Sequence, residues 1–148
     1  MKHFLISIDK STQSITNLDN ADNITVVNSE HLTILFDGTL ENIAQTYQSE
    51  GIHFIKKLYN PFALVLFDKS TNEIYLARDK VGIKPLYYYD SGTTLIIGTH
   101  LKKFHKITNY VSKINPAVLG EYLQFGFILQ PNTIFEDTYK VSAGEYHC

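Results

Sequence analysis

The stretch that decides the fold is Ala77-Arg78-Asp79-Lys80-Val81-Gly82-Ile83-Lys84-Pro85-Leu86-Tyr87-Tyr88-Tyr89. It continues an apolar run from Glu73 to Ala77, which is typical of a β-strand. Gly82 permits backbone angles that other residues avoid, whereas Pro85 fixes its own φ and favours an extended Lys84. The pattern predicts a strand, a tight bend and a second strand, in its simplest form a β-hairpin with an exposed Arg-Asp ion pair.

Short apolar runs on both sides of this stretch predict further strands. They cover His3–Ile8, Ile24–Val27, Leu32–Phe36, Phe62–Phe67, Glu73–Arg78, Leu86–Tyr89 and Thr94–Gly98. Polar turn sequences at Asp68–Asn72 and Asp90–Thr93 predict that the last four strands form two hairpins. The segment Lys10–Asn23 is rich in Ser, Thr, Asn and Asp, and we interpret it as turn and loop. Antiparallel hairpins with a few helices indicate the α+β class.

A first helix is predicted to open at Asp37-Gly38-Thr39, because apolar residues then recur at helical spacing. Its apolar face consists of Leu40, Ile43, Ala44 and Tyr47. Asp37 or Thr39 would cap the first amides, and Gly51 would end the helix. The shorter apolar set from Ile52 to Leu58 predicts one more helical turn.

A second helix is predicted after Asn115, which is a good N-cap and is followed by a proline at the first helical position. Its inner face would consist of Leu119, Tyr122 and Leu123, and Gly126 would end it.

Composition narrows the functional classes. The chain has 148 residues, of which 44% are hydrophobic, so we expect one globular domain spanning residues 1–148. The net charge of -2 without a basic block argues against nucleic acid. No apolar run is long enough for a bilayer, and no signal peptide is evident. The only cysteine is Cys148, which rules out an internal disulfide and fits a cytoplasmic protein. Among the six histidines only His100 and His105 are close in sequence, and a five-residue step does not place both on one helical face, so no metal site is predicted.

Several motifs occur together in a specific order. They are Phe62-Ala-Leu-Val-Leu-Phe-Asp68, Leu76-Ala-Arg-Asp79, Gly82-Ile-Lys-Pro-Leu-Tyr-Tyr88, Leu95-Ile-Ile-Gly-Thr-His-Leu-Lys102, Leu123-Gln-Phe-Gly-Phe127, Asn132-Thr-Ile-Phe135 and Ser142-Ala-Gly-Glu-Tyr146. This series resembles the glutaminase domain of the asparagine synthetase family, from about Ile52 to the end. The resemblance implies a class II glutamine amidotransferase with the N-terminal-nucleophile (Ntn) hydrolase-like architecture. That architecture is an αββα sandwich of two antiparallel sheets, here in a reduced version.

The nucleophile of that family is a cysteine directly after the initiator methionine, with its own α-amine as general base. The opening strand of this chain aligns on the family's without gaps, and Lys2 occupies the cysteine position. A primary ammonium near its normal pKa is a poor nucleophile at pH 7, whereas a thiolate can attack an amide. Cys148 falls in the closing segment of the fold. The resemblance therefore provides no catalytic residue in this chain.

Other family signals are also changed. The Arg-His-Arg-Gly-Pro-Asp run and the Arg-Leu-Ser-Ile segment that holds the glutamine carboxylate are absent. Asp37-Gly38-Thr39 stands where the family has the Asn-Gly-Glu of its oxyanion hole, and a carboxylate there would repel a developing oxyanion. Alternatively, Asp37-Gly38 aligns with a later Ser-Asp pair of the glutamine site. Either alignment makes Asp37 and Gly38 a vestigial substrate-binding site.

The elements that serve the scaffold are intact: Arg78, Asp79, Gly82, Lys84 and Pro85. The resemblance thus implies a catalytically degenerate domain that keeps the frame and docks on an asparagine-synthetase-type domain, in cis or in trans. That ATP-dependent partner would form an amide or a lactam, and it would bring ATP and magnesium. This chain has no Ser-Gly-Gly-x-Asp-Ser pyrophosphate loop, so no cofactor is expected in it, and it is either truncated or a split subunit.

Two alternatives remain open. The chain could be an active glutamine-hydrolysing fragment that uses an unrecognised nucleophile. It could also be a module that binds a small ligand or a peptide in the vestigial pocket.

Overall fold

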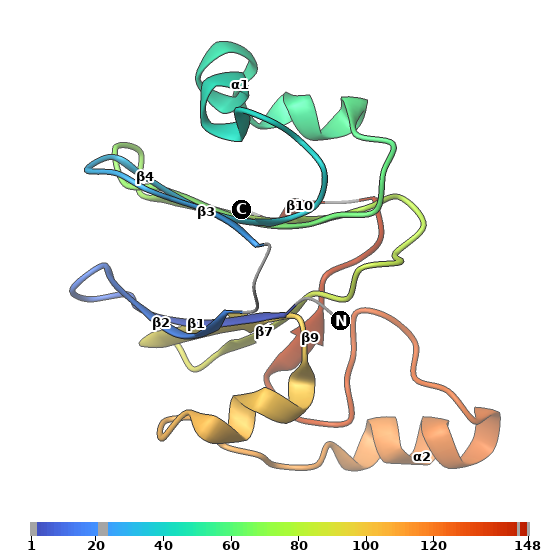
Figure 1. The fold of residues 1–148 in the computed structure, drawn as a ribbon. Helices are drawn as coiled ribbons and strands as arrows, with labels where there is room; N and C mark the ends of the chain where they lie inside the picture. Colours follow the sequence, from blue (N-terminus) through green and yellow to red (C-terminus); the bar gives the residue numbers. More distant parts are fainter. Residues whose placement is uncertain (1–2, 21–23, 145, 148) are drawn as a thin grey trace.

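Two five-stranded antiparallel sheets lie face to face in the computed structural model, which describes residues 3–20, 24–144 and 146–147 (Figure 1). The lower sheet has the order β2 (Ser14–Asn20), β1 (Phe4–Asp9), β8 (Thr94–Gly98), β7 (Tyr87–Asp90) and β9 (Thr138–Lys140). The upper sheet has the order β10 (Tyr146–His147), β6 (Glu73–Arg78), β5 (Ala63–Asp68), β4 (Leu32–Asp37) and β3 (Thr25–Asn28).

Helices cover the outer face of each sheet. The helix α1 (Ile43–Glu50) and the 3-10 helix η1 (Gly51–Lys57) lie above the upper sheet, whereas the 3-10 helix η2 (Leu101–Lys106) and α2 (Pro116–Phe125) lie below the lower one (Figure 1). The layers are therefore helix, sheet, sheet and helix, which confirms the predicted α+β sandwich of two antiparallel sheets. The longest helix, α2, has ten residues, so no helix in the described part of the chain can cross a membrane.

The central strands are buried on both faces, which explains their continuous apolar sequences. In β1, Phe4, Ile6 and Ile8 point into the core between the sheets, while Leu5 packs on the other side, against Phe104 of η2. Alternation of side chains along a strand produces this division. The strands β4 and β5 divide in the same way between the central core and the cluster under α1 and η1.

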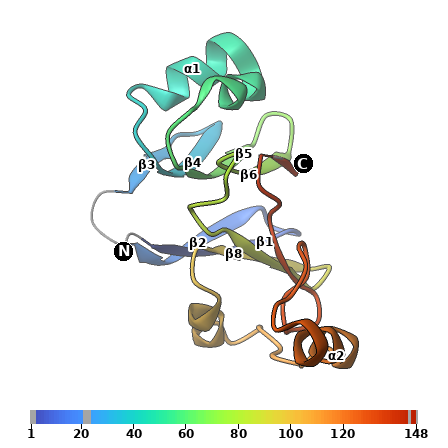
Figure 2. The same ribbon diagram turned by 90° about the vertical axis from the view of Figure 1, so that its right-hand side faces the viewer.

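The segment from Arg78 to Tyr89 is not a hairpin, and that prediction is wrong. The strand β6 belongs to the upper sheet and β7 to the lower one, so residues 79–86 cross from one sheet to the other (Figure 2). The physical reason for the crossover is the burial of Leu86, which packs in the core between the sheets. The two other predicted hairpins are confirmed, because β5 pairs with β6 and β7 pairs with β8.

The interpretation of Lys10–Asn23 as turn and loop is also wrong, because Ser14–Asn20 forms the edge strand β2 against β1. An edge strand leaves one side unpaired and open to water, so polar side chains are tolerated there. Ile15 of this strand packs on the central core.

The first helix starts later than predicted. The helix α1 begins at Ile43, its N-cap is Asn42 with φ 55°, and no side chain caps its amides. Neither Asp37 nor Thr39 is a cap, because the chain between them and Ile43 is still irregular. The predicted end at Gly51 is confirmed, since that residue has φ 63°.

The ends of α2 are confirmed, but its predicted inner face is wrong. The Asn115 side chain accepts hydrogen bonds from the amides of Ala117 and Val118, and Gly126 ends the helix with φ 78°. Val118 is the buried residue of α2. By contrast, all three predicted inner residues are exposed: Leu119, Tyr122 and Leu123.

Candidate functional site

Strand register places the predicted site residues at one end of the sandwich. In the upper sheet, Asp37 at the end of β4 pairs with Ala63, which in turn pairs with Arg78 at the end of β6. In the lower sheet, Gly98 at the end of β8 pairs with both Leu5 and Tyr87. The start of β1, the end of β4 and the crossover at residues 79–86 therefore lie at the same end of the two sheets.

Asp79 organises the crossover. One carboxylate oxygen accepts the amide N–H of Ile83 at 2.9 Å and the other accepts that of Lys84 at 2.9 Å. The residue is only 4% exposed. Burial by itself would raise the pKa of Asp79, but the amides that point at the carboxylate hold it below its ordinary value. The ionised carboxylate thus fixes the backbone of the bend.

Arg78 links the crossover to the C-terminal segment. Its guanidinium is 2% exposed and donates to the carbonyl of Val141 at 3.1 Å and to the carbonyl of Gly82. Burial lowers the pKa of Arg78, and the charge of Asp79 opposes this effect. The prediction of an exposed Arg-Asp ion pair is wrong, because both side chains are buried and hydrogen-bond to backbone groups.

Gly82 is required by both backbone and space. It has φ 75°, and a Cβ at this position would lie 2.5 Å from Nη2 of Arg78. Any other residue would be strained in this left-handed conformation and would also displace the guanidinium.

An ion pair ties the predicted substrate residues to the crossover. The Nζ atom of Lys84 lies 3.0 Å from Oδ2 and 3.1 Å from Oδ1 of Asp37, which is 1% exposed. Next to it, the Phe36 ring fills the space where a side chain at Gly38 would stand. The carboxylate that was predicted to line a vestigial substrate site is thus neutralised by Lys84 within the fold.

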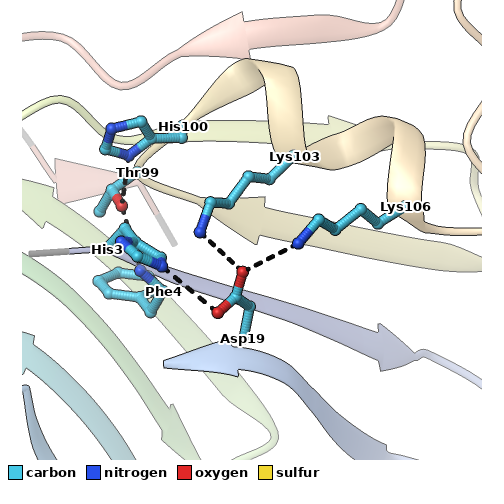
Figure 3. Close-up of polar contacts among 7 residues, drawn as sticks. All are labelled: His3, Phe4, Asp19, Thr99, His100, Lys103 and Lys106. Carbon is cyan, nitrogen blue, oxygen red and sulfur yellow. Dashed lines mark hydrogen bonds and ion pairs between the residues drawn. The ribbon is translucent and has the colours of Figure 1, made fainter. Parts of the chain in front are cut away.

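A second polar cluster lies at the start of β1 (Figure 3). Asp19 of β2 accepts from Lys103 at 2.7 Å and from Lys106 at 3.3 Å, and its other oxygen is 3.3 Å from Nε2 of His3. The hydrogen bond and charge of Lys103 lower the pKa of Asp19 to about 2. This cluster links the start of β1 and the edge strand β2 to η2.

Beside this cluster, the buried hydroxyl of Thr99 accepts the amide of Phe4 at 3.2 Å and lies 3.3 Å from Nδ1 of His100. Burial lowers the pKa of His100, and the nearby His3 and Lys103 lower it further. The imidazole of His100 is therefore favoured in its neutral form at neutral pH.

Lys2, which was predicted to occupy the nucleophile position, lies outside the described residues, as does Cys148. Within residues 3–20, 24–144 and 146–147, no three His, Cys, Asp or Glu side chains are arranged to hold a metal ion.

The sequence matches the family model of the glutamine amidotransferase domain over residues 25–148. The chain belongs to this family. The amidotransferase domain is 31% identical over 148 residues to the putative asparagine synthetase [glutamine-hydrolyzing] 2 of Methanocaldococcus jannaschii, with 91% of this chain and 29% of that protein covered. It is 30% identical over 108 residues to asparagine synthetase [glutamine-hydrolyzing] 1 of Bacillus subtilis, with 73% of this chain and 17% of that protein covered.

A third relative is amidase chry2 of Gibberella zeae, 32% identical over 107 residues, with 72% of this chain and 15% of that protein covered. The amidotransferase domain thus spans less than a third of the length of these relatives. A solved structure, the glutamine phosphoribosylpyrophosphate amidotransferase of B. subtilis, aligns with a TM-score of 0.39 and 13% identity over 78% of this chain and 39% of that one.

The predicted resemblance to a class II amidotransferase domain of the asparagine synthetase family is confirmed. Of the predicted site residues, the fold brings together Asp37, Arg78, Asp79, Gly82 and Lys84. Sequence reasoning missed the cluster around Asp19, and no local signal could have found it, because Asp19 and Lys103 are 84 positions apart.

Proposed function

We propose that this amidotransferase domain does not hydrolyse glutamine and instead supports an ATP-dependent domain that forms an amide or a lactam. The observation that carries the proposal is the identity of the second residue. By its resemblance to the family's opening strand we align Lys2 with the family's cysteine, and the only cysteine of the sequence is Cys148. A thiolate can attack the glutamine amide, whereas the ammonium of a lysine near its normal pKa is a poor nucleophile.

The contacts of Asp37 support the same proposal. In an amidotransferase, the position of Asp37 would face developing negative charge, for which preorganised donors are needed. Here the Asp37 carboxylate is buried and forms an ion pair with Lys84, which is partly exposed. The intact part of the family pattern is the crossover, which connects the two sheets and has no role in amide chemistry.

The docking role is supported by the length of the relatives. The segment that they share with this chain is 29%, 17% and 15% of the three proteins. In this proposal, ATP and magnesium bind to the partner domain, which contacts this chain in cis or in trans.

Glutamate release from glutamine tests the loss of activity. We expect no release above the buffer blank, with asparagine synthetase [glutamine-hydrolyzing] 1 of B. subtilis as the positive control. The variant Lys2→Cys should also remain inactive, because the Arg-Leu-Ser-Ile segment that would bind the substrate is missing. Glutamate release by the unmodified chain would refute the proposal. If the variant Lys2→Ala released glutamate as well, the nucleophile would be another residue.

Docking is tested with the part of the M. jannaschii relative that lies outside the segment matched by this chain. We expect the two polypeptides to co-purify after co-expression. Failure of the unmodified chain to bind this probe would count against the docking role.

A further inference from the structure

The exposed apolar side chains of this protein are gathered in one segment. Of twelve large apolar side chains that are exposed in the described part of the chain, eight lie between residues 111 and 129. These eight form what we call the α2 surface: Val111, Ile114, Leu119, Tyr122, Leu123, Phe125, Phe127 and Leu129. Leu123 is the most exposed of them, at 77%. Apolar patches of this kind on a folded domain indicate an interaction site.

The α2 surface is almost free of charge. From Ile114 to Phe135 the only charged residue is Glu121. At its border, Lys113 and Glu136 are paired at 2.7 Å, and this pairing raises the pKa of Lys113. A membrane-surface helix needs Lys or Arg beside its apolar face, and nucleic acid needs clustered cations. The α2 surface has neither feature, so its occupant is an apolar, uncharged protein surface.

The α2 surface is held in a fixed position. The amide of Asn115 donates to the carbonyl of Ile134 at 2.9 Å, and the amide of Glu136 donates to the carbonyl of Lys113 at 2.8 Å. The segments just before and just after α2 and its following loop are therefore hydrogen-bonded to each other in the manner of neighbouring strands. Figure 1 shows α2 below the lower sheet, and it contributes only Val118 to the buried residues. The fold thus presents this helix to the outside.

The shape of the α2 surface argues against a second copy of the chain. At 3.6 residues per turn, the exposed apolar positions from Tyr122 round to Leu123 occupy about 100° of the helix, and the surface continues into Phe125, Phe127 and Leu129. Two convex helices meet along a narrow seam, which would leave most of this surface in water. A concave face of a larger domain can cover all of it.

Gly120 gives room for close contact in the middle of the helix. Apart from its chain neighbours and the backbone of its own helix, no atom lies within 4 Å of a Cβ built on it. Glycine inside a helix costs about 1 kcal/mol relative to alanine, and the open space beside Gly120 would accommodate a Cβ. A partner backbone that packs against this position provides a reason for it.

We propose that the α2 surface is the face on which the ATP-using, amide-forming domain docks. This inference rests on the proposed function and names the contact surface for it. The length of the relatives selects this occupant, because each carries most of its chain outside the segment shared with this protein.

The test measures binding of the M. jannaschii probe by sedimentation or co-purification. Leu123→Glu and Phe127→Glu place a charge on the α2 surface at exposed positions, and we expect each to weaken binding at least tenfold. Val26→Glu is the matched control, because Val26 is 48% exposed on β3 of the upper sheet. We expect it to change binding less than twofold. Circular dichroism and urea midpoints show that each variant is folded, and Leu129→Glu replaces any variant that is not.

The outcomes separate the two proposals. If the unmodified chain binds and the α2 variants bind equally well, the surface assignment is overturned while the docking role stands. If the unmodified chain does not bind, the docking role fails and the assignment fails with it. If the unmodified chain is a dimer that Leu123→Glu converts to a monomer, the occupant is a second copy and the assignment is likewise overturned.

Discussion

Replacement of Asp79 by asparagine should destabilise the domain by about 2–4 kcal/mol. The carboxylate binds the amides of Ile83 and Lys84 at 2.9 Å, and the side chain is 4% exposed. An asparagine side chain keeps one acceptor and turns an NH₂ group towards the second amide. The magnitude follows from the hydrogen bond that remains but loses its charge assistance, worth about 1 kcal/mol, and from the amide that is left without an acceptor, worth about 1–3 kcal/mol.

Urea unfolding measures this loss, and with an ordinary m-value the midpoint should fall by roughly 1–2 M. Asp137→Asn is the matched control. Asp137 is exposed, has φ 52° and makes no side-chain hydrogen bond in the structure, and asparagine tolerates this conformation. We expect the control to stay within about 0.5 kcal/mol of the unmodified protein.

The effect of Asp79 should also depend on pH. Because the folded protein holds the pKa of Asp79 below the ordinary value of 3.8, its contribution is fully present above that value and is lost as the pH falls through the folded pKa. The difference in the free energy of unfolding between the unmodified protein and Asp79→Asn should therefore become smaller in acid. A variant as stable as the unmodified protein at pH 7, or a gap that does not narrow, would refute this reasoning.

Two further substitutions test the geometry. Gly82→Ala should lower stability in urea by about 1–3 kcal/mol, because a Cβ there is strained and displaces a guanidinium. Gly92→Ala has a positive φ but open space, so a loss as large as that of Gly82→Ala would contradict the steric part of the argument. Lys103→Gln should raise the pKa of Asp19 from about 2 towards 3.8, as measured by NMR titration. An unchanged titration would mean that this lysine does not hold the carboxylate.

Apolar strands could be predicted from the sequence, because burial on both faces leaves a continuous apolar run. This signal located β1, β4, β5 and β8. It failed for β2, because an edge strand such as Ser14–Asn20 has no need of apolar side chains on its open side. It also failed at the crossover, since a local strand-bend-strand pattern does not specify whether the second strand joins the same sheet. That choice depends on the burial of Leu86 among residues distant in sequence.

Helical periodicity identified an apolar face on α2 but not what covers it. Leu119, Tyr122 and Leu123 follow the spacing of a core-facing stripe, and a stripe that faces a partner has the same spacing. Side-chain pairing across the fold was also beyond sequence reasoning, because Asp37 and Lys84 meet over 47 positions. The importance of Arg78, Asp79 and Gly82 could be predicted, because this combination of residue types is specific to the family.

The strand order has a consequence for how the polypeptide assembles during synthesis. The strands β3 to β6 are sheet neighbours in chain order, so most of the upper sheet can pair as soon as Arg78 has left the ribosome. By contrast, β1 must wait for β8, whose residues emerge some 90 positions later. Until then β1 and β2 form only an isolated two-stranded ribbon, which is marginally stable in water. We therefore expect synthesis and pairing of the second half of the chain to limit the rate of folding, since strands that are distant in sequence pair slowly.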